Sequence, residues 1–246
     1  MVSITFNGTD LSTFGLELQQ IVAPITQEAK FAQLQDKAYL FEAVRPGKVI
    51  QLSCIIYADN LTDLLTKIDN INKVIAIKEP KPLILGHQTD RYWMAQFQQM
   101  TGPFTGIGAY EIELVFFAAD PLAYAVDETI YITTLNTDPW IRTLNVRGTA
   151  EASPVYTLTP QSGPFGDQII FTNITTGQTL IIDKEPVVGD VIVIDTERWI
   201  VTNNSIPIMN LIEGQFPRLK PGNNSLNISG LGNSPQLKVE YRGRFI

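Results

Sequence analysis

Few residues in this 246-residue chain carry side chains suited to catalysis. His87 is the only histidine and Cys54 the only cysteine, so the usual zinc sites and Cys/His nucleophile pairs cannot be assembled. We expect His87 to be an ordinary residue of a loop or strand end. Cys54 has no partner for an intrachain disulfide. The sequence therefore predicts no metal site, no cofactor and no nucleophilic centre.

Two pairs of carboxylates lie close enough in sequence for acid and base chemistry. Glu111 and Glu113 flank one residue of a predicted strand, so their side chains share a face and could form a glycosidase-like pair. Glycosidase carboxylates, however, come from separate elements across a cleft, which favours a solvated strand face here. Asp195 and Glu197 lie at an expected hairpin tip, where turn geometry alone favours Asp. We therefore expect the protein not to be an enzyme.

The glycine-rich segment 102–108 precedes a predicted strand rather than a helix, so it lacks the geometry of a phosphate-binding loop. We interpret it as a flexible hairpin connection. Because exposed loop tips often make contacts in assemblies, we hypothesise that it is an assembly loop. Its candidate residues are Gly102, Phe104, Gly106 and Gly108.

Three tryptophans, Trp93, Trp140 and Trp199, could stack on sugar rings, but packing in a core or on a sheet face is favoured. The net charge of −7 and the lack of clustered Lys and Arg argue against a nucleic-acid-binding surface. No basic and apolar leader opens the chain, and no apolar run approaches a membrane span. We expect synthesis in the cytosol and no membrane segment.

One segment has helical periodicity. Apolar residues recur at i, i+3, i+4 and i+7 between Leu61 and Ile75, Asp59 or Asn60 precedes them as a candidate N-cap, and Pro80 prevents continuation. The remaining segments favour strands with Gly or Pro punctuation, and segment 23–45 suggests loops or arms. Predicted strands cover residues 3–6, 47–57, 83–85, 91–99, 109–117, 155–158, 168–172, 179–183, 191–195, 198–203, 225–229 and 237–245.

The strand spacing changes near residue 126, after a strongly apolar strand ends at Asp120-Pro121. We predict a mainly β protein of two domains. Residues 1–126 form a β-sheet or sandwich with one amphipathic helix, and residues 127–246 form a β-sandwich with hairpin turns at 175–178 and 195–198. Closely spaced turn signals make the second half an independent folding unit.

The segment 216–225 combines two prolines with a Gly-Asn pair, which we expect to make a tight turn seated on the sandwich by apolar residues. Its role is predicted to be structural. The residues of this structural motif are Phe216, Pro217, Leu219, Pro221, Gly222 and Asn223.

Three stretches together resemble the distal tail proteins of phages with long, non-contractile tails. They are the amino-terminal strand plan ending at Asp120-Pro121, the segment 146–154, and the segment 216–225 with the terminal strand 237–245. In the second, Arg147 stands where the family usually has Asn.

The resemblance implies a structural virion protein at the tail tip. It implies a hexameric ring of amino-terminal belt domains, which connects the tail tube to the baseplate and leaves a channel for DNA. The second domain would be galectin-like. Implied partners are further copies of the chain, the tail tube protein, the tail hub or tail-associated protein, and receptor-binding proteins. The alternative is a carbohydrate-binding host-adsorption module, although galectin-type recognition needs a histidine-containing cluster that the second domain lacks.

Overall fold

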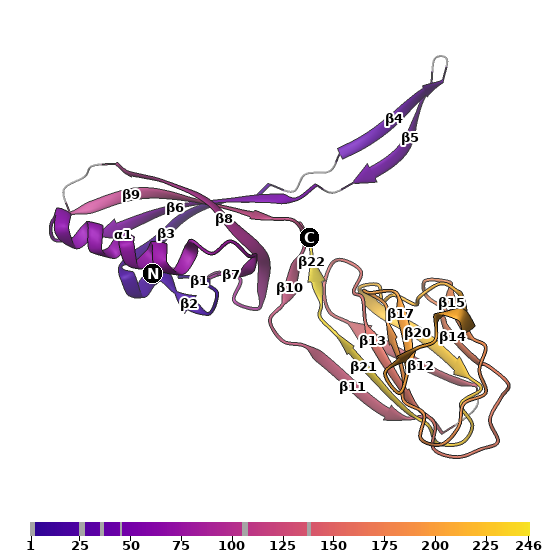
Figure 1. Ribbon diagram of the computed structural model, residues 1–246. Helices are drawn as coiled ribbons and strands as arrows, with labels where there is room; N and C mark the ends of the chain where they lie inside the picture. The colour runs from indigo at the N-terminus through magenta and orange to yellow at the C-terminus, as the bar shows by residue number, and fades with distance from the viewer. Residues whose placement is uncertain (1–2, 25–27, 35–36, 45, 105–107, 137–138) are drawn as a thin grey trace. The chain divides into compact units, whose positions relative to one another are not determined.

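The computed structural model describes residues 3–24, 28–34, 37–44, 46–104, 108–136 and 139–246 (Figure 1). Internal contacts divide the chain into two compact units, which we call unit 1 (Met1–Val126 with Ile246) and unit 2 (Asp127–Phe245). The prediction of a mainly β protein with one amphipathic α-helix is confirmed.

The elements of unit 1 are, in chain order, β1 (Ile4–Phe6), β2 (Thr9–Asp10), the 3-10 helix η1 (Leu11–Phe14), β3 (Leu16–Val22), β4 (Glu28–Leu34), β5 (Lys37–Val44), β6 (Lys48–Tyr57), α1 (Leu61–Ile75), β7 (Lys81–Leu85), β8 (Arg91–Phe104), β9 (Ala109–Ala118) and β10 (Ala123–Ala125). The main sheet has the strand order β2-β1-β7-β8-β9-β6-β3, with antiparallel pairs throughout, and β10 pairs with β8. β4 and β5 form a separate two-stranded sheet. Segment 23–45, for which loops or arms were predicted, therefore contains a two-stranded β-hairpin.

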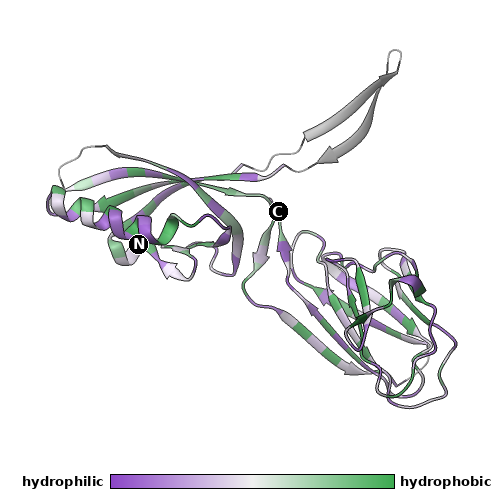
Figure 2. Ribbon diagram, viewed as in Figure 1, coloured by the Kyte–Doolittle hydropathy of each residue, from purple (hydrophilic) through white to green (hydrophobic). Residues whose placement is uncertain are grey.

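One face of the main sheet is buried and the other is exposed. Burial alternates strictly along β6, where Ile50, Leu52 and Ile56 are fully buried and Val49 and Tyr57 are exposed. Figure 2 shows the matching alternation of apolar and polar residues along the strands. Such alternation is typical of a sheet that is covered on one side only.

The α-helix begins and ends where the sequence predicts. Asn60 is the N-cap: its backbone is extended, and its side-chain oxygen accepts a hydrogen bond of 3.0 Å from the N–H of Asp63. Lys67 then pairs with Asp63 at 2.7 Å and donates to the carbonyl of Tyr57 at 2.8 Å, which ties the helix to the end of β6. The helix buries a stripe, Leu64, Ile71 and Ile75, against the apolar side of unit 1.

The elements of unit 2 are β11 (Thr129–Thr134), β12 (Trp140–Val146), β13 (Val155–Thr159), β14 (Ile169–Asn173), β15 (Gln178–Ile182), β16 (Ile192–Asp195), β17 (Ile200–Asn203), β18 (Ile206–Pro207), the 3-10 helix η2 (Met209–Leu211), β19 (Ile212–Gly214), β20 (Gly222–Ser229), β21 (Gln236–Tyr241) and β22 (Arg244–Phe245). They form one sheet of order β11-β21-β13-β16-β17-β18 and a second of order β12-β20-β14-β15-β19. Both predicted hairpins, β14–β15 and β16–β17, are confirmed.

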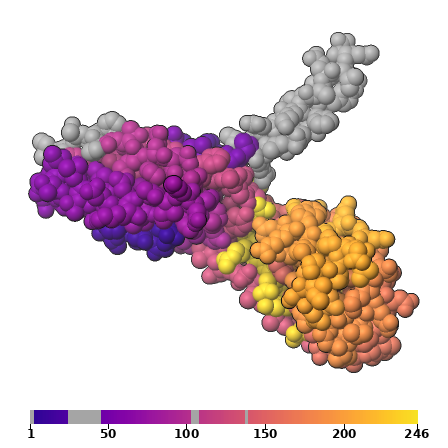
Figure 3. Space-filling model, in the orientation of Figure 1, coloured from indigo at the N-terminus to yellow at the C-terminus, as the bar shows by residue number. Residues whose placement is uncertain are grey.

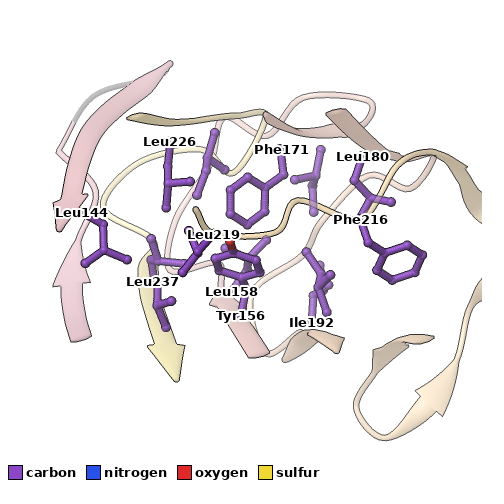
Figure 4. Close-up of a cluster of buried hydrophobic side chains, with 14 of the residues drawn as sticks. Leu144, Tyr156, Leu158, Phe171, Leu180, Ile192, Phe216, Leu219, Leu226 and Leu237 are labelled. Carbon is purple, nitrogen blue, oxygen red and sulfur yellow. The ribbon is translucent and has the colours of Figure 1, made fainter. Parts of the chain in front are cut away.

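The two sheets of unit 2 enclose one hydrophobic core, part of which Figure 4 shows. Tyr156 of β13 and Phe171 of β14 meet edge to face across it, with ring centroids 4.4 Å apart. Four strands of unit 2, β11, β12, β18 and β19, were not predicted from the sequence. The predicted terminal strand 237–245 is interrupted, because Arg242 and Gly243 separate β21 from β22.

Candidate functional site

The segment 216–224 makes contacts with both sheets of unit 2. Phe216 and Leu219 are buried in the core. The hydroxyl of Tyr156, from one sheet, donates to the carbonyl of Pro217 at 3.0 Å. Leu219 exchanges two backbone hydrogen bonds with Ala152, of 2.9 and 3.1 Å. The segment is therefore fixed by both apolar burial and directed hydrogen bonds.

Two fully buried asparagines, which the sequence did not single out, hold this segment to the other sheet. Asn173 of β14 donates its side-chain amide to the carbonyl of Arg218 (2.6 Å) and to the Oδ1 of Asn224 (3.1 Å). Asn224 in turn accepts from the N–H of Lys220 (2.9 Å) and donates to the carbonyls of Lys220 (2.7 Å) and Gly222 (3.1 Å). Since the Oδ1 of Asn173 accepts from the N–H of Thr175 (3.0 Å), every polar atom of the two amides has a partner, as burial requires.

The predicted tight turn at Gly222 and Asn223 is wrong in its position. The bend lies at Pro221, and Gly222 already begins β20, where it pairs with Val146. Gly222 has a φ of 86°, a conformation that glycine adopts without strain. The turn is closed by the side chain of Asn224, because an amide can replace backbone groups on both sides of a bend.

The glycine-rich segment 102–108 connects β8 to β9, which pair as an antiparallel hairpin. β8 extends further than predicted and includes Gly102 and Phe104, with a register shift between Thr101 and Phe104. Gly102 has a φ of 107°, and a Cβ there would lie 2.7 Å from the carbonyl oxygen of Glu111. Gly106 lies outside the described residues, and Gly108 is exposed with a φ of 77°.

Glu111 and Glu113 lie on the exposed face of the main sheet in unit 1, on β9. They line a shallow hollow of about 430 Å³ whose other walls include Gln20 of β3 and Ser53 of β6. Since Ile55 pairs with both Glu17 and Glu111, a third carboxylate, Glu17, points to the same face. All three side chains come from one sheet and project in parallel, which is unlike the opposed carboxylates of a glycosidase.

The tryptophans differ in their surroundings. Trp93 and Trp140 are buried, as expected. The expectation was wrong for Trp199, which is 53% exposed and has a φ of 57° just before β17. Its ring and that of Phe216 are in an edge-to-face arrangement with centroids 5.4 Å apart, and the guanidinium of Arg218 lies 4.9 Å from the centroid of the Trp199 ring. These contacts leave about half of the indole open to solvent.

The other candidate chemical groups have structural surroundings. His87 is an exposed turn residue. Asp195 accepts hydrogen bonds from the N–H groups of Glu197 (3.0 Å) and Arg198 (2.9 Å), which is the turn chemistry predicted for the hairpin tip. Cys54 is buried, and this burial raises the pKa of its thiol to about 12. Among the described residues, no group of three or more His, Cys, Asp or Glu side chains could hold a metal ion.

A partly buried ion pair stabilises the β16–β17 side of unit 2. Asp190 accepts from the Nζ of Lys184 (2.5 Å), the amide of Asn203 (2.7 Å) and the N–H of Val187 (3.0 Å). Burial alone would raise the pKa of Asp190, but these hydrogen bonds outweigh it and hold the pKa below the usual value.

None of the described helices is long and apolar enough to span a membrane.

Comparison with known proteins identifies both units. A model of the phage tail protein RIFT-related domain matches residues 7–115, and a model of the siphovirus-type tail component, C-terminal domain, matches residues 147–245. The distal tail protein of Bacillus phage SPP1 is 24% identical over 190 residues, which are 72% of this chain and 69% of that protein.

The solved structure of a distal tail protein has the same fold. The crystal structure of the SPP1 Dit protein, described as a paradigm of the hub adsorption apparatus in phages that infect Gram-positive hosts, aligns over all of both chains with a TM-score of 0.79 and 16% identity. A chain of the phage P2 baseplate in its activated conformation with Ca aligns over 97% of both chains with a TM-score of 0.46 and 10% identity. Matched by domain models in both units and by the SPP1 distal tail protein, the chain belongs to the distal tail protein family of siphophages, whose members are components of the baseplate hub.

Proposed function

We propose that the protein forms a ring of six copies at the tail tip, which joins the tail tube to the host-adsorption apparatus and leaves a channel for DNA. Unit 1 forms the belt of the ring. Unit 2, as a galectin-like sandwich, docks receptor-binding and other baseplate proteins. The other partners are the tail tube protein and the tail hub or tail-associated protein. Family membership supports this proposal.

The observation that carries the proposal is the exposed face of the main sheet in unit 1. Val49 and Phe117 are cross-strand neighbours on this face, 43% and 37% exposed, and Met94 of β8 is also 37% exposed. Val22 of β3 is 43% exposed. It lies on the same face, because it pairs with Gln51 of β6, two residues after Val49. Apolar side chains grouped on an open sheet face indicate a surface that another molecule covers. In a ring, that molecule is the neighbouring copy.

The other end of the same face is acidic. Glu17 projects from β3, and Glu111 and Glu113 project from β9, on the two sides of β6, and Gln20 and Ser53 line the same hollow. A surface lined with carboxylates repels phosphates, so a channel with this lining would pass DNA without holding it. The negative charge therefore supports the proposal that this end of the sheet face lines the channel.

The hairpin connection 102–108 is the proposed assembly loop. It joins β8 and β9, the two strands that carry Met94 and Phe117, so contacts made by the loop and by the apolar part of the face would come from one hairpin. Deleting residues 103–107 should leave unit 1 folded but weaken ring formation.

The proposal is tested by native mass spectrometry of the full chain at micromolar concentration. Phe117→Glu places a charge in the apolar part of the face and should shift the ring to monomers. Thr66→Glu, on the exposed side of α1, introduces the same charge elsewhere in unit 1 and should leave the ring intact. Rings of equal abundance in both variants would contradict the proposed interface.

Carbohydrate binding by unit 2 is a second candidate, favoured by the half-exposed indole of Trp199. Indole faces stack on sugar rings, but the Arg218 guanidinium already lies 4.9 Å from the centroid of this ring. A glycan array with the native chain and Trp199→Ala tests it. Binding that the variant loses would support this function, and an array without any specific signal would reject it.

A further inference from the structure

The edges of the two sheets in unit 2 differ in their protection against further strand pairing. An edge strand has unpaired N–H and C=O groups, and proteins usually protect it with charges, proline or very short strands. Three of the four sheet edges of unit 2 carry such protection. β18 is two residues long and contains Pro207, β19 contains Glu213 and Gly214, and β12 contains the exposed Arg142.

The fourth edge strand, β11, has none of these features. Its sequence is Thr-Ile-Tyr-Ile-Thr-Thr, without charge, proline or glycine and rich in residues of high β propensity. On its inner edge all six residues pair with β21, from Thr129 with Tyr241 to Thr134 with Gln236. Figure 1 shows β11 at the margin of unit 2, and within the described sheet it has no strand on its other side.

The side chains of β11 also favour continuation of the sheet. Ile130 and Ile132 project from the outer face and are 54% and 56% exposed, while Tyr131 projects inward and packs against the core. In the space-filling view of Figure 3, the pink residues near position 130 border the yellow residues of the last strands in unit 2. The core therefore fixes the register of β11 and leaves both isoleucines and one full backbone edge available.

We propose that β11 pairs edge to edge with β11 of a second copy of this chain, in an antiparallel contact about a two-fold axis. The axis passes by Tyr131, so that Ile130 of one copy lies opposite Ile132 of the other, and Tyr131 lies opposite Tyr131. In this register each isoleucine gains an apolar cross-strand neighbour and the two faces of the sheet continue unbroken.

A second copy fits this edge because the strand is complementary to itself. The two acidic residues before β11, Asp127 and Glu128, are exposed. In the proposed register Glu128 lies opposite Thr134 and Asp127 opposite Leu135, so no two carboxylates of the pair face each other. A contact of this kind is isologous and closes on itself as a pair. It does not depend on the ring, since it uses unit 2 alone.

Cysteine cross-linking of the full chain tests the register. Ile130→Cys and Ile132→Cys are prepared separately, and each is oxidised alone and after mixing. Directly opposed residues of an antiparallel pair have Cα atoms about 4.5–5.5 Å apart, within disulfide range, whereas diagonal residues are about 7–8 Å apart. We expect a covalent dimer in the mixture and almost none in either variant alone. The native Cys54 is buried and should not contribute.

A gatekeeper substitution provides the second test. Ile132→Lys places a charge on the edge and should reduce the dimeric species in sedimentation velocity at least tenfold. Ile141→Lys, at an equally exposed isoleucine (59%) on β12, makes the same change at an edge that already carries Arg142, and should have no effect. Cross-linking of one variant alone, no cross-link in the mixture, or concentration-dependent aggregates without a discrete pair would overturn the proposal.

Discussion

Asn224→Ala is predicted to destabilise unit 2 more than the same substitution at Asn223, the other asparagine of segment 216–224. The side chain is fully buried and takes part in four hydrogen bonds, to Lys220 twice, to Gly222 and to Asn173. At a net contribution of about 1 kcal/mol for each hydrogen bond, the loss in the free energy of unfolding is about 4 kcal/mol. The bend at Pro221 also loses the side chain that closes it.

The assay is urea unfolding followed by tryptophan fluorescence in a Trp93→Phe background. Two tryptophans then remain, Trp140 and Trp199, both in unit 2, so the signal reports the unit that carries Asn224. The midpoint for Asn224→Ala should fall, with an unchanged slope if the transition stays two-state.

Asn223→Ala is the matched control, because the two asparagines are adjacent but differ in burial. Asn223 is exposed, and its side chain accepts one surface hydrogen bond of 2.8 Å from Asn145. Its loss should cost no more than about 0.5 kcal/mol. Equal effects of the two substitutions, or a loss below about 1 kcal/mol for Asn224→Ala, would refute the reasoning.

Three further predictions concern other described residues. Asp190→Asn removes the charge paired with Lys184 and should cost about 2 kcal/mol at pH 7. Because the pKa of Asp190 is lowered, the difference should persist above the ordinary carboxyl pKa of about 4 and vanish as the pH falls through the lowered value, and a pH-independent difference in urea midpoints would contradict this. Cys54 should not react with a thiol reagent at pH 8 until the chain unfolds, so rapid labelling of native protein would show that it is accessible. Gly214→Ala should lower the thermal midpoint by several degrees, because its Cβ would lie 2.2 Å from the carbonyl oxygen of Thr179 and φ is 93°, and an unchanged midpoint would contradict that clash.

The sequence predicts the parts of the fold that depend on local patterns. The helix is identified by its periodicity and by the two candidate N-caps, Asp59 and Asn60, of which Asn60 is the cap in the structure, because capping and amphipathicity act within a few residues. The hairpin tip at Asp195 is identified for the same reason, since its carboxylate accepts from N–H groups two and three residues further on.

The sequence does not reveal features that depend on distant residues. The Oδ1 of Asn173 accepts a local hydrogen bond from the N–H of Thr175 at 3.0 Å. Its decisive bonds to Arg218 and Asn224, however, join residues 45 and 51 positions apart. Trp199 was expected to pack in a core or on a sheet face, but its left-handed backbone at the hairpin turns the ring partly outward. β11 and β12 were missed because their partners, β21 and β20, lie far along the chain.

The most direct test of the proposed function is electron cryomicroscopy of the purified full-length chain, with classification of every closed particle. We predict six-fold rings with a central hole in which unit 1 surrounds the hole and the Glu111 side of its main sheet faces it. Monomers at all concentrations and ionic strengths, or closed particles whose hole is lined by unit 2, would contradict the account.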